Sequence, residues 1–156
     1  MSEALQLVDA DAHVNPPATF WDDYLPRKFA GRGPKIEAGA PGEPHDWVVF
    51  EGSRKPLNIL SSVVKQGRDF RPTGRQSDLQ AGTWEPSARL EDMARDGVAR
   101  AVLFGGGPLG TSDNDLYLAS FQAYNHWLAD FCSYDPKRLV ARPTCRCRTS
   151  TNRSLC

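Results

Sequence analysis

The sequence predicts an α/β protein with a parallel sheet, because short apolar runs alternate with longer amphipathic segments. Three runs have the length and composition of strands, at 4–13, 99–104 and 138–141. Between the last two, apolar residues recur every three or four positions, which is the period of one helix face. The order strand, helix, strand, helix, strand is typical of parallel sheets with right-handed crossovers, which close into a barrel or form a doubly wound sheet.

The composition fits one globular domain and excludes several classes of partner. The chain has 156 residues, enough for one ordinary domain with a core. Lys plus Arg and Asp plus Glu both number 19, so no charge excess favours nucleic acid or a membrane surface. The sequence has no run long enough to span a bilayer and no signal-peptide pattern. We expect a soluble, cytoplasmic protein without nucleic-acid or membrane partners, and a homo-oligomer is possible.

The end of the first strand is the most informative feature for function. The apolar run 5–8 predicts a buried strand, and Asp9, Asp11 and His13 follow it at alternate positions. Side chains alternate along a strand, so these three are expected to share one face. A carboxylate and an imidazole two residues apart can hold one side of a metal ion, and such pairs occur where strand ends open into active sites. A structural or capping role is the alternative.

A short helix is expected next, within 16–29. Phe20, Trp21, Tyr24 and Leu25 are spaced like one helix face that stops before Pro26.

Residues 31–82 are rich in Gly, Pro and Arg and show little periodicity, which predicts an irregular insertion folded over another part of the chain. Within this segment, 46–52 is expected to form a hairpin strand and 57–65 a short helix. His45 is expected to be a surface residue rather than a ligand.

Regular structure is predicted to return at Pro86, which suits the first turn of a helix that stops at Gly97. The strand 99–104 then runs into Gly105-Gly106-Gly107. This glycine run lacks the GxGxxG spacing and the following Lys of a phosphate loop, so it is interpreted as a tight turn after the strand.

The longest predicted helix is capped by Asp113 or Asn114 and ends at Asp135-Pro136, before the strand 138–141. His126 lies beside its apolar stripe and is expected to be a partly exposed packing residue. The stripe consists of Tyr117, Phe121, Tyr124, Leu128 and Phe131.

The order of these motifs resembles the N-terminal part of the amidohydrolase superfamily, in the branch of aminocarboxymuconate-semialdehyde decarboxylase and related metal-dependent decarboxylases and hydrolases. The resemblance covers residues 5 to about 141. The segments that carry it are 8–14, 20–26, 84–93, 96–98, 124–131 and 135–139.

The resemblance implies the N-terminal portion of a (β/α)8 TIM-type barrel, with about three strands in 1–141 and the insertion 31–82 after the first. Such barrels need about 250 residues, and the family's remaining metal ligands and catalytic residues lie on later strands. Asp11 and His13 match the first-strand metal ligands, where the family usually carries His-x-His. Asn15 is the candidate substrate-binding residue, and no catalytic residue is assigned.

The implied chemistry is metal-assisted. The divalent ion would be zinc, with manganese as the alternative, and it would lower the pKa of bound water and polarise a substrate oxygen. The expected reaction is decarboxylation of a small-molecule carboxylic acid or a related substrate, and hydrolysis is the alternative. Because most of the active site has no counterpart in 1–141, we expect this chain to be inactive alone.

Residues 142–156 depart from every earlier pattern, with four Arg, three Cys and no acidic residue. One interpretation is a small non-enzymatic protein that binds metal through Cys145, Cys147 and Cys156, or nucleic acid through its Arg residues. Cys-x-Cys is not zinc-ribbon spacing, however, and no aromatic residue interleaves the Arg residues for base stacking. We favour a shifted reading frame and a truncated form of a longer enzyme.

Overall fold

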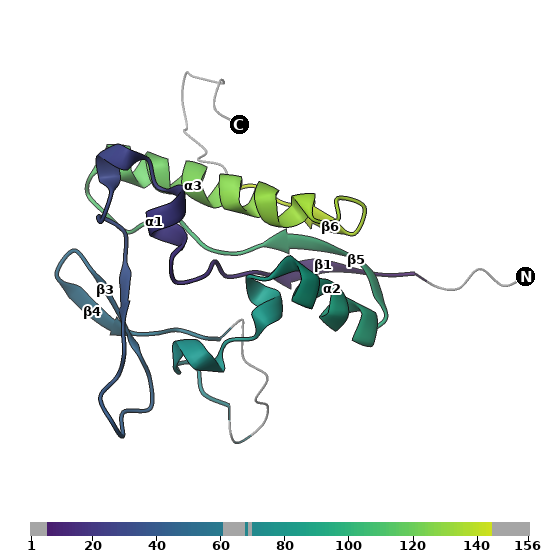
Figure 1. Ribbon diagram of the computed structural model, residues 1–156, viewed down its shortest axis with the longest axis horizontal. Coiled ribbons are helices and arrows are strands. Elements are labelled where there is room, and N and C mark those ends of the chain that lie inside the picture. Colours follow the sequence, from purple (N-terminus) through teal and green to yellow (C-terminus); the bar gives the residue numbers. More distant parts are fainter. Residues whose placement is uncertain (1–5, 61–67, 69, 145–156) are drawn as a thin grey trace, which may run out of the picture.

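Two three-stranded sheets form the framework of the chain (Figure 1), and the computed structural model describes residues 6–60, 68 and 70–144. The parallel sheet contains β1 (Leu7–His13), β5 (Val98–Phe104) and β6 (Leu139–Ala141), and the antiparallel sheet contains β2 (Lys35–Glu37), β3 (Trp47–Phe50) and β4 (Ser53–Pro56). The α-helices are α1 (Phe20–Tyr24), α2 (Pro86–Arg95) and α3 (Asn114–Ser133), and the single-turn helices are η1 (Arg27–Phe29), η3 (Gln76–Asp78) and η4 (Ala81–Thr83).

The parallel sheet has the strand order β1-β5-β6, which confirms the predicted α/β class. The helix α2 precedes β5 and α3 precedes β6, so each supplies a crossover between parallel neighbours. In register, His13 lies opposite Phe104 and Leu103 lies opposite Ala141. The carboxyl ends of the strands therefore meet at one edge of the sheet.

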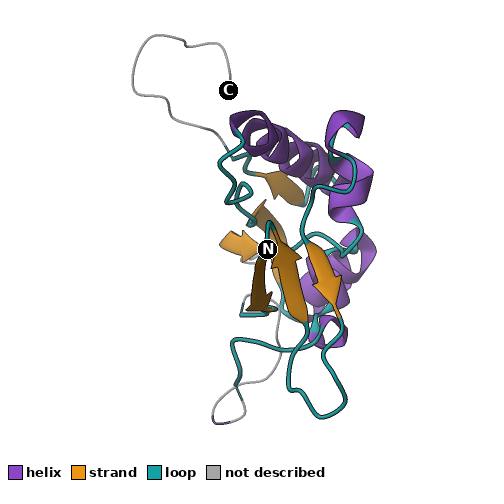
Figure 2. Ribbon diagram, turned by 90° about the vertical axis from the view of Figure 1, so that its left-hand side faces the viewer, coloured by secondary structure: helices purple, strands orange, loops and turns teal. Residues whose placement is uncertain are grey.

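The helices cover one face of this sheet, on which the core lies (Figure 2). Ala101 and Leu103 in β5 and Leu139 in β6 are almost completely buried there. Val102 and Val140, which pair across β5 and β6, lie on the opposite face, and Val140 remains 43% exposed. The two faces thus differ in burial because only one of them packs against α2 and α3.

The first strand is less buried than its apolar start predicts. Leu7 and Val8 are 51% and 53% exposed, and Ala12 is the buried residue of β1. The reason is the position of β1 at an edge of the sheet, where it has one neighbouring strand.

The long helix α3 begins as predicted, because the Asp113 carboxylate accepts hydrogen bonds from the N–H groups of Asp115 and Leu116. Its buried stripe differs in detail from the prediction. Tyr117 and Phe121 are only half-buried and contact each other edge to face at 5.1 Å. The buried residues are Leu116, Ala119, Ser120, Ala123, Tyr124, Trp127, Leu128, Phe131 and Cys132.

The segment 31–82 is more regular than predicted, because it contains the antiparallel sheet of β2, β3 and β4. The hairpin β3–β4 confirms the expected strand within 46–52, and Glu51 and Gly52 between its strands both have positive φ, of 45° and 76°. A two-residue turn with positive φ at both positions matches the twist of the flanking strands. Local periodicity could not indicate β2, which is three residues long.

The prediction of a helix at 57–65 is wrong for the described residues 57–60. Residues 57–60 contain no helix: Asn58 forms an isolated bridge with Thr73, and Leu60 lies in a turn. The remaining positions 61–65 lie outside the described residues.

One buried carboxylate holds this segment together. The Asp46 side chain accepts hydrogen bonds from the N–H groups of Gly39 and Gln76 at 2.9 and 2.8 Å. These donors hold the pKa of Asp46 below its usual range, with a smaller contribution from Arg75.

Among the described residues, no helix combines the length and apolar character needed to cross a membrane.

Candidate functional site

Asp11 and His13 lie side by side at the carboxyl end of β1. The Oδ1 atom of Asp11 is 3.8 Å from the Nδ1 atom of His13, and their side chains are 79% and 45% exposed. The His13 ring packs against Phe104 with a centroid distance of 4.9 Å. The structure therefore brings an oxygen donor and a nitrogen donor together on the accessible side of the strand.

Asp9 does not share their face, contrary to the sequence prediction. The register has Asp9 opposite Ala101 and Ala12 opposite Leu103, so β1 contains one more residue than β5 over this stretch. Such a bulge breaks the alternation of side chains. The Asp9 carboxylate instead accepts a hydrogen bond from the Asp11 N–H at 3.0 Å, which holds the backbone at the bulge.

Asn15 lies just beyond the strand and is half-buried. Its N–H donates to the carbonyl of Thr83 at 2.9 Å, and the N–H of Val14 donates to the carbonyl of Phe104 at 3.1 Å. These bonds connect the chain after β1 to η4 and to the end of β5. They hold Asn15, which is two residues beyond His13, next to the segment that leads into α2.

The glycine run after β5 forms a close turn against the chain after β1. A side chain at Gly105 would collide with the Val14 carbonyl oxygen. Gly106 has φ of 56°, and a Cβ atom there would lie 2.6 Å from Cε2 of Tyr124. At Gly105 and Gly106, neighbouring atoms therefore leave no room for a side chain, as expected for a tight turn rather than for a phosphate loop.

The other histidines lie on different elements. His126 is exposed on α3. His45 precedes β3, is half-buried rather than at the surface as predicted, and contacts the Trp47 ring edge to face at 4.6 Å. Within the described part of the chain, no group of three or more His, Cys, Asp or Glu residues is placed to hold a metal ion.

The described cysteine is not a reactive thiol. Cys132 is buried in α3, and burial raises the pKa of its thiol to about 11. Cys145, Cys147 and Cys156, the candidate ligands of the tail, lie outside the described residues.

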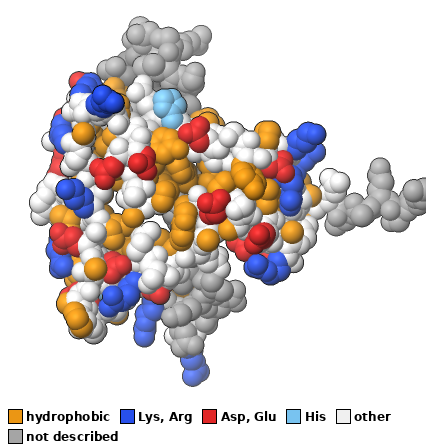
Figure 3. All heavy atoms as spheres, viewed as in Figure 1, with side chains coloured by type: hydrophobic (Ala, Val, Ile, Leu, Met, Phe, Trp, Pro, Cys, Tyr) orange, Lys and Arg blue, Asp and Glu red, His pale blue; other side chains and the backbone are white. Residues whose placement is uncertain are grey.

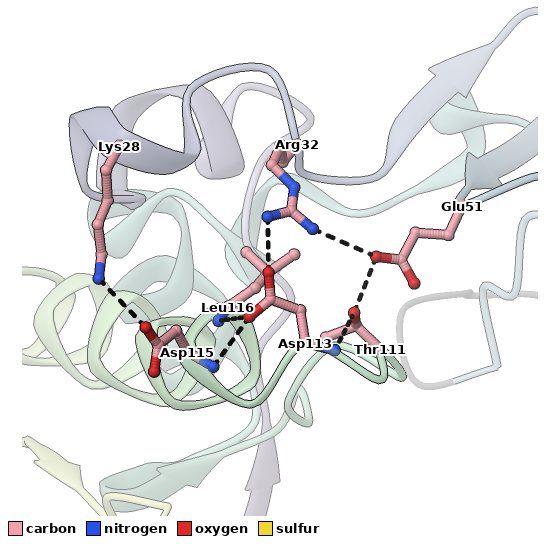
Figure 4. Close-up of polar contacts among 7 residues, drawn as sticks. All are labelled: Lys28, Arg32, Glu51, Thr111, Asp113, Asp115 and Leu116. Carbon is pink, nitrogen blue, oxygen red and sulfur yellow. Dashed lines mark hydrogen bonds and ion pairs between the residues drawn. The ribbon is translucent and has the colours of Figure 1, made fainter.

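A separate group of charged side chains joins three segments near the start of α3 (Figure 4). Arg32 forms ion pairs with Asp113 at 2.7 Å and with Glu51 at 3.7 Å. The Thr111 hydroxyl donates to Glu51 at 2.8 Å. Because each carboxylate already has a cation or a donor, this cluster is structural and offers no unpaired group for chemistry.

Phe104 and Thr83 are neighbours of the site that sequence patterns do not indicate. Phe104 supports the His13 ring, and Thr83 accepts the backbone bond from Asn15. The only sequence signal for Phe104 is its position as the last apolar residue of a strand. Thr83 carries no signal, because its role depends on where η4 packs.

The fold is similar to part of a solved amidohydrolase structure. Over 90% of its residues, the chain superposes on the crystal structure of an amidohydrolase from Mycobacterium avium subsp. paratuberculosis K-10, with a TM-score of 0.58 and 20% sequence identity. The chain spans 43% of the length of that structure. No family model and no curated protein sequence matches the chain. The similarity concerns the mixed α/β fold with its parallel sheet.

Proposed function

We propose that this chain supplies the first metal-binding strand of an amidohydrolase-type (β/α)8 barrel, with β1, β5 and β6 as three barrel strands. The observation that carries this proposal is the Asp11–His13 pair, 3.8 Å apart at the carboxyl end of a parallel strand. Active sites of such barrels form at this end of the strands. The chain spans 43% of the length of the amidohydrolase structure, which supports a partial barrel.

The donor chemistry of the pair fits two positions of a metal shell. A carboxylate oxygen and an imidazole nitrogen are both ordinary zinc ligands, and manganese also accepts them. Catalytic zinc commonly takes three protein ligands, so the described residues account for only part of a shell. When bound, the ion would supply Lewis-acid polarisation of a substrate oxygen and a lowered pKa for water.

The residues around the pair would orient it. Packing against Phe104 restricts the ring of His13, and the Asp9 bond to the Asp11 N–H fixes the backbone that leads into the first ligand. Asn15, two residues beyond His13, would bind a polar group of the substrate. Asp11 and His13 would remain exposed enough to adjust their distance around a cation.

The reaction we propose for the complete barrel is decarboxylation of a small-molecule carboxylic acid, and hydrolysis is the second candidate. The resemblance of the motifs from 8–14 to 135–139 supports this choice. We propose further that the chain alone is inactive, because its described part lacks the third ligand and an assigned general acid or base.

The test is a zinc titration of the full chain followed by calorimetry. Wild-type protein should bind one zinc ion weakly, and His13→Ala should abolish that binding. His126→Ala is the matched control, because it removes an exposed histidine from α3 and should leave zinc binding unchanged. Asp11→Asn should weaken binding by about tenfold, since it removes the charge but keeps an oxygen.

The same titration distinguishes the Asp11–His13 site from a metal site in the tail. Loss of zinc binding in Cys145→Ala, with normal binding in His13→Ala, would overturn the proposed site and favour a non-enzymatic binding protein.

We also propose that 142–156 come from a shifted reading frame of a longer gene. The support is composition: four Arg, three Cys and no acidic residue follow a chain of balanced charge. The hydrogen bonds of the described tail residues use backbone groups, since the Arg142 N–H donates to Leu103 and Thr144 pairs with Asn125 through its own N–H and carbonyl. Any residue other than proline could make these bonds. The Arg142 guanidinium also lies over the Phe104 ring, 5.3 Å from its centroid. Downstream nucleotides that encode no further barrel strands in another frame would contradict the proposal.

A further inference from the structure

A pocket of about 220 Å³ lies between the chain after β1, the start of α1, the antiparallel sheet and the glycine turn after β5. Its walls come from the antiparallel sheet, from α1 and α3, and from the loops after β1 and β5. Asp11 and His13 do not line it. In parallel α/β folds, the loops after the strands are where ligands commonly bind, and two of these loops form this pocket.

The walls of the pocket are apolar. Ile36 in β2 and Val48 in β3 are opposite each other in register, and both line it. Phe20 and Trp21 form another wall, with ring centroids 4.5 Å apart. Gly33 packs so closely on Trp21 that a side chain at position 33 would collide with it. Figure 3, in the orientation of Figure 1, shows that hydrophobic side chains also gather across the middle of one face of the molecule.

The chemistry of the lining excludes a charged ligand group. None of the residues that line the pocket is charged, and three of them are prolines. A charge placed there would lose its hydration without gaining a partner.

The third aromatic wall carries a polar atom without a partner. Tyr124 is 3% exposed, and its hydroxyl has no hydrogen-bond partner among the described residues. Burial raises the pKa of Tyr124, so this hydroxyl stays neutral. A buried hydroxyl without a partner is costly, and a small movement of the Tyr124 ring that brought it to a ligand atom in the pocket would recover the bond.

We propose that this pocket binds an uncharged, single-ring aromatic group that carries a hydroxyl, independently of the metal site. The size agrees with this assignment, because an engineered apolar cavity of about 150 Å³ holds benzene. A pocket of about 220 Å³ has room for one substituted ring. The flat rings of Phe20, Trp21 and Tyr124 provide surfaces for stacking.

The test measures binding of p-cresol to the full chain in EDTA, by ligand-observed NMR and calorimetry. The charged analogue p-toluate should bind at least about tenfold more weakly. Gly107→Leu should fill the pocket, since position 107 lines it, is not in the left-handed region, and has open space around a Cβ atom. Gly110→Leu is the matched control, because position 110 has the same freedom but does not line the pocket.

A second pair of variants tests the pocket without changing the glycine turn, in case Gly107→Leu misfolds. Val48→Phe should also abolish p-cresol binding, whereas Val49→Phe, at the next position of β3 and outside the lining, should not. Tyr124→Phe should reduce the preference for p-cresol over toluene, and an unchanged preference would contradict the hydroxyl contact.

Equal binding of p-cresol by wild type, Gly107→Leu and Val48→Phe would overturn the proposal, as would p-toluate binding as tight as that of p-cresol. Since the assay contains no metal, its failure is distinct from failure of the zinc site. His13→Ala should retain p-cresol binding while losing zinc.

Discussion

The Nη1 atom of Arg32 lies 2.7 Å from the Oδ2 atom of Asp113, although the residues are 81 positions apart. The other carboxylate oxygen of Asp113 caps α3 through the N–H groups of Asp115 and Leu116. One side chain thus begins the longest helix and fastens it to the segment between α1 and β2 (Figure 4). The position of this segment matters for function because it runs into β2, one wall of the pocket.

The two roles of Asp113 can be separated by substitution. Asp113→Asn keeps an oxygen for the cap but loses the ion pair, and Asp113→Ala loses both. We expect the melting temperature to fall from wild type to Asp113→Asn and further to Asp113→Ala. Asp115→Asn is the control, because its pair with Lys28 spans 3.8 Å between exposed side chains and should contribute little. An equal effect of all three substitutions would contradict this account.

The acid stability of the protein should also depend on Asp113. The hydrogen bond from Arg32, followed by the bonds from the backbone, holds the pKa of Asp113 below its usual value in the folded state. A lowered folded-state pKa stabilises the fold above the unfolded value of about 3.9, and this contribution is lost as the pH falls through the folded value. In urea unfolding, the difference between wild type and Asp113→Asn should therefore shrink below about pH 4. A constant difference from neutral to acidic pH would rule out this linkage.

The glycine turn after β5 should tolerate no side chain at position 106. Gly106→Ala should reduce the free energy of unfolding by about 1–3 kcal/mol, the usual cost of a left-handed conformation for another residue. A Cβ atom there would also lie 2.6 Å from the Tyr124 ring. Gly110→Ala has open space and ordinary φ and should be close to neutral. Chemical denaturation of both variants checks the prediction, and equal stabilities would contradict it.

The parallel sheet should make the isolated chain self-associate. In the described part, β1 and β6 each have one neighbouring strand, and Val140 exposes apolar surface on the uncovered face. Open edges and apolar faces promote association between chains. We expect concentration-dependent oligomers or aggregation in sedimentation velocity, reduced by Val140→Lys. Leu118→Lys, at a similarly exposed apolar position on α3, should have less effect. A monomer with a sharp cooperative melt at all concentrations would refute this prediction.

The isolated chain should show no measurable decarboxylase or hydrolase turnover with added zinc or manganese. The reason is the incomplete set of metal ligands around Asp11 and His13 in the described residues. Product formation from small aromatic and enoic carboxylic acids can be followed by chromatography. Turnover that disappears in His13→Ala would show that this expectation is wrong.

Several elements were predictable because their signals are local. Pro86 and Gly97 bound α2, and Asp113 caps α3, since helix ends depend on neighbouring backbone groups. The strands β5 and β6 follow from short apolar runs next to these helices. Asp11 and His13 lie 3.8 Å apart, as their spacing of two positions predicts, although Asp11 falls within the bulge between Asp9 and Ala12.

Other features depended on contacts that no local pattern encodes. The bulge that separates Asp9 from Asp11 arises from pairing with β5, roughly ninety positions away in the chain. The strand β2 is stable because it pairs with β3, and Tyr117 and Phe121 lie at the edge of the helix face that packs.

The sequence by itself determined the α/β order, the helix ends and the two neighbouring donors after the first strand, because each depends on residues within one or two turns. Only the tertiary structure decided which side chains surround them. Phe104 supports His13, Thr83 holds Asn15, and the pocket gathers Phe20, Val48 and Tyr124. Such neighbours come from distant parts of the chain, and their positions depend on how whole elements pack.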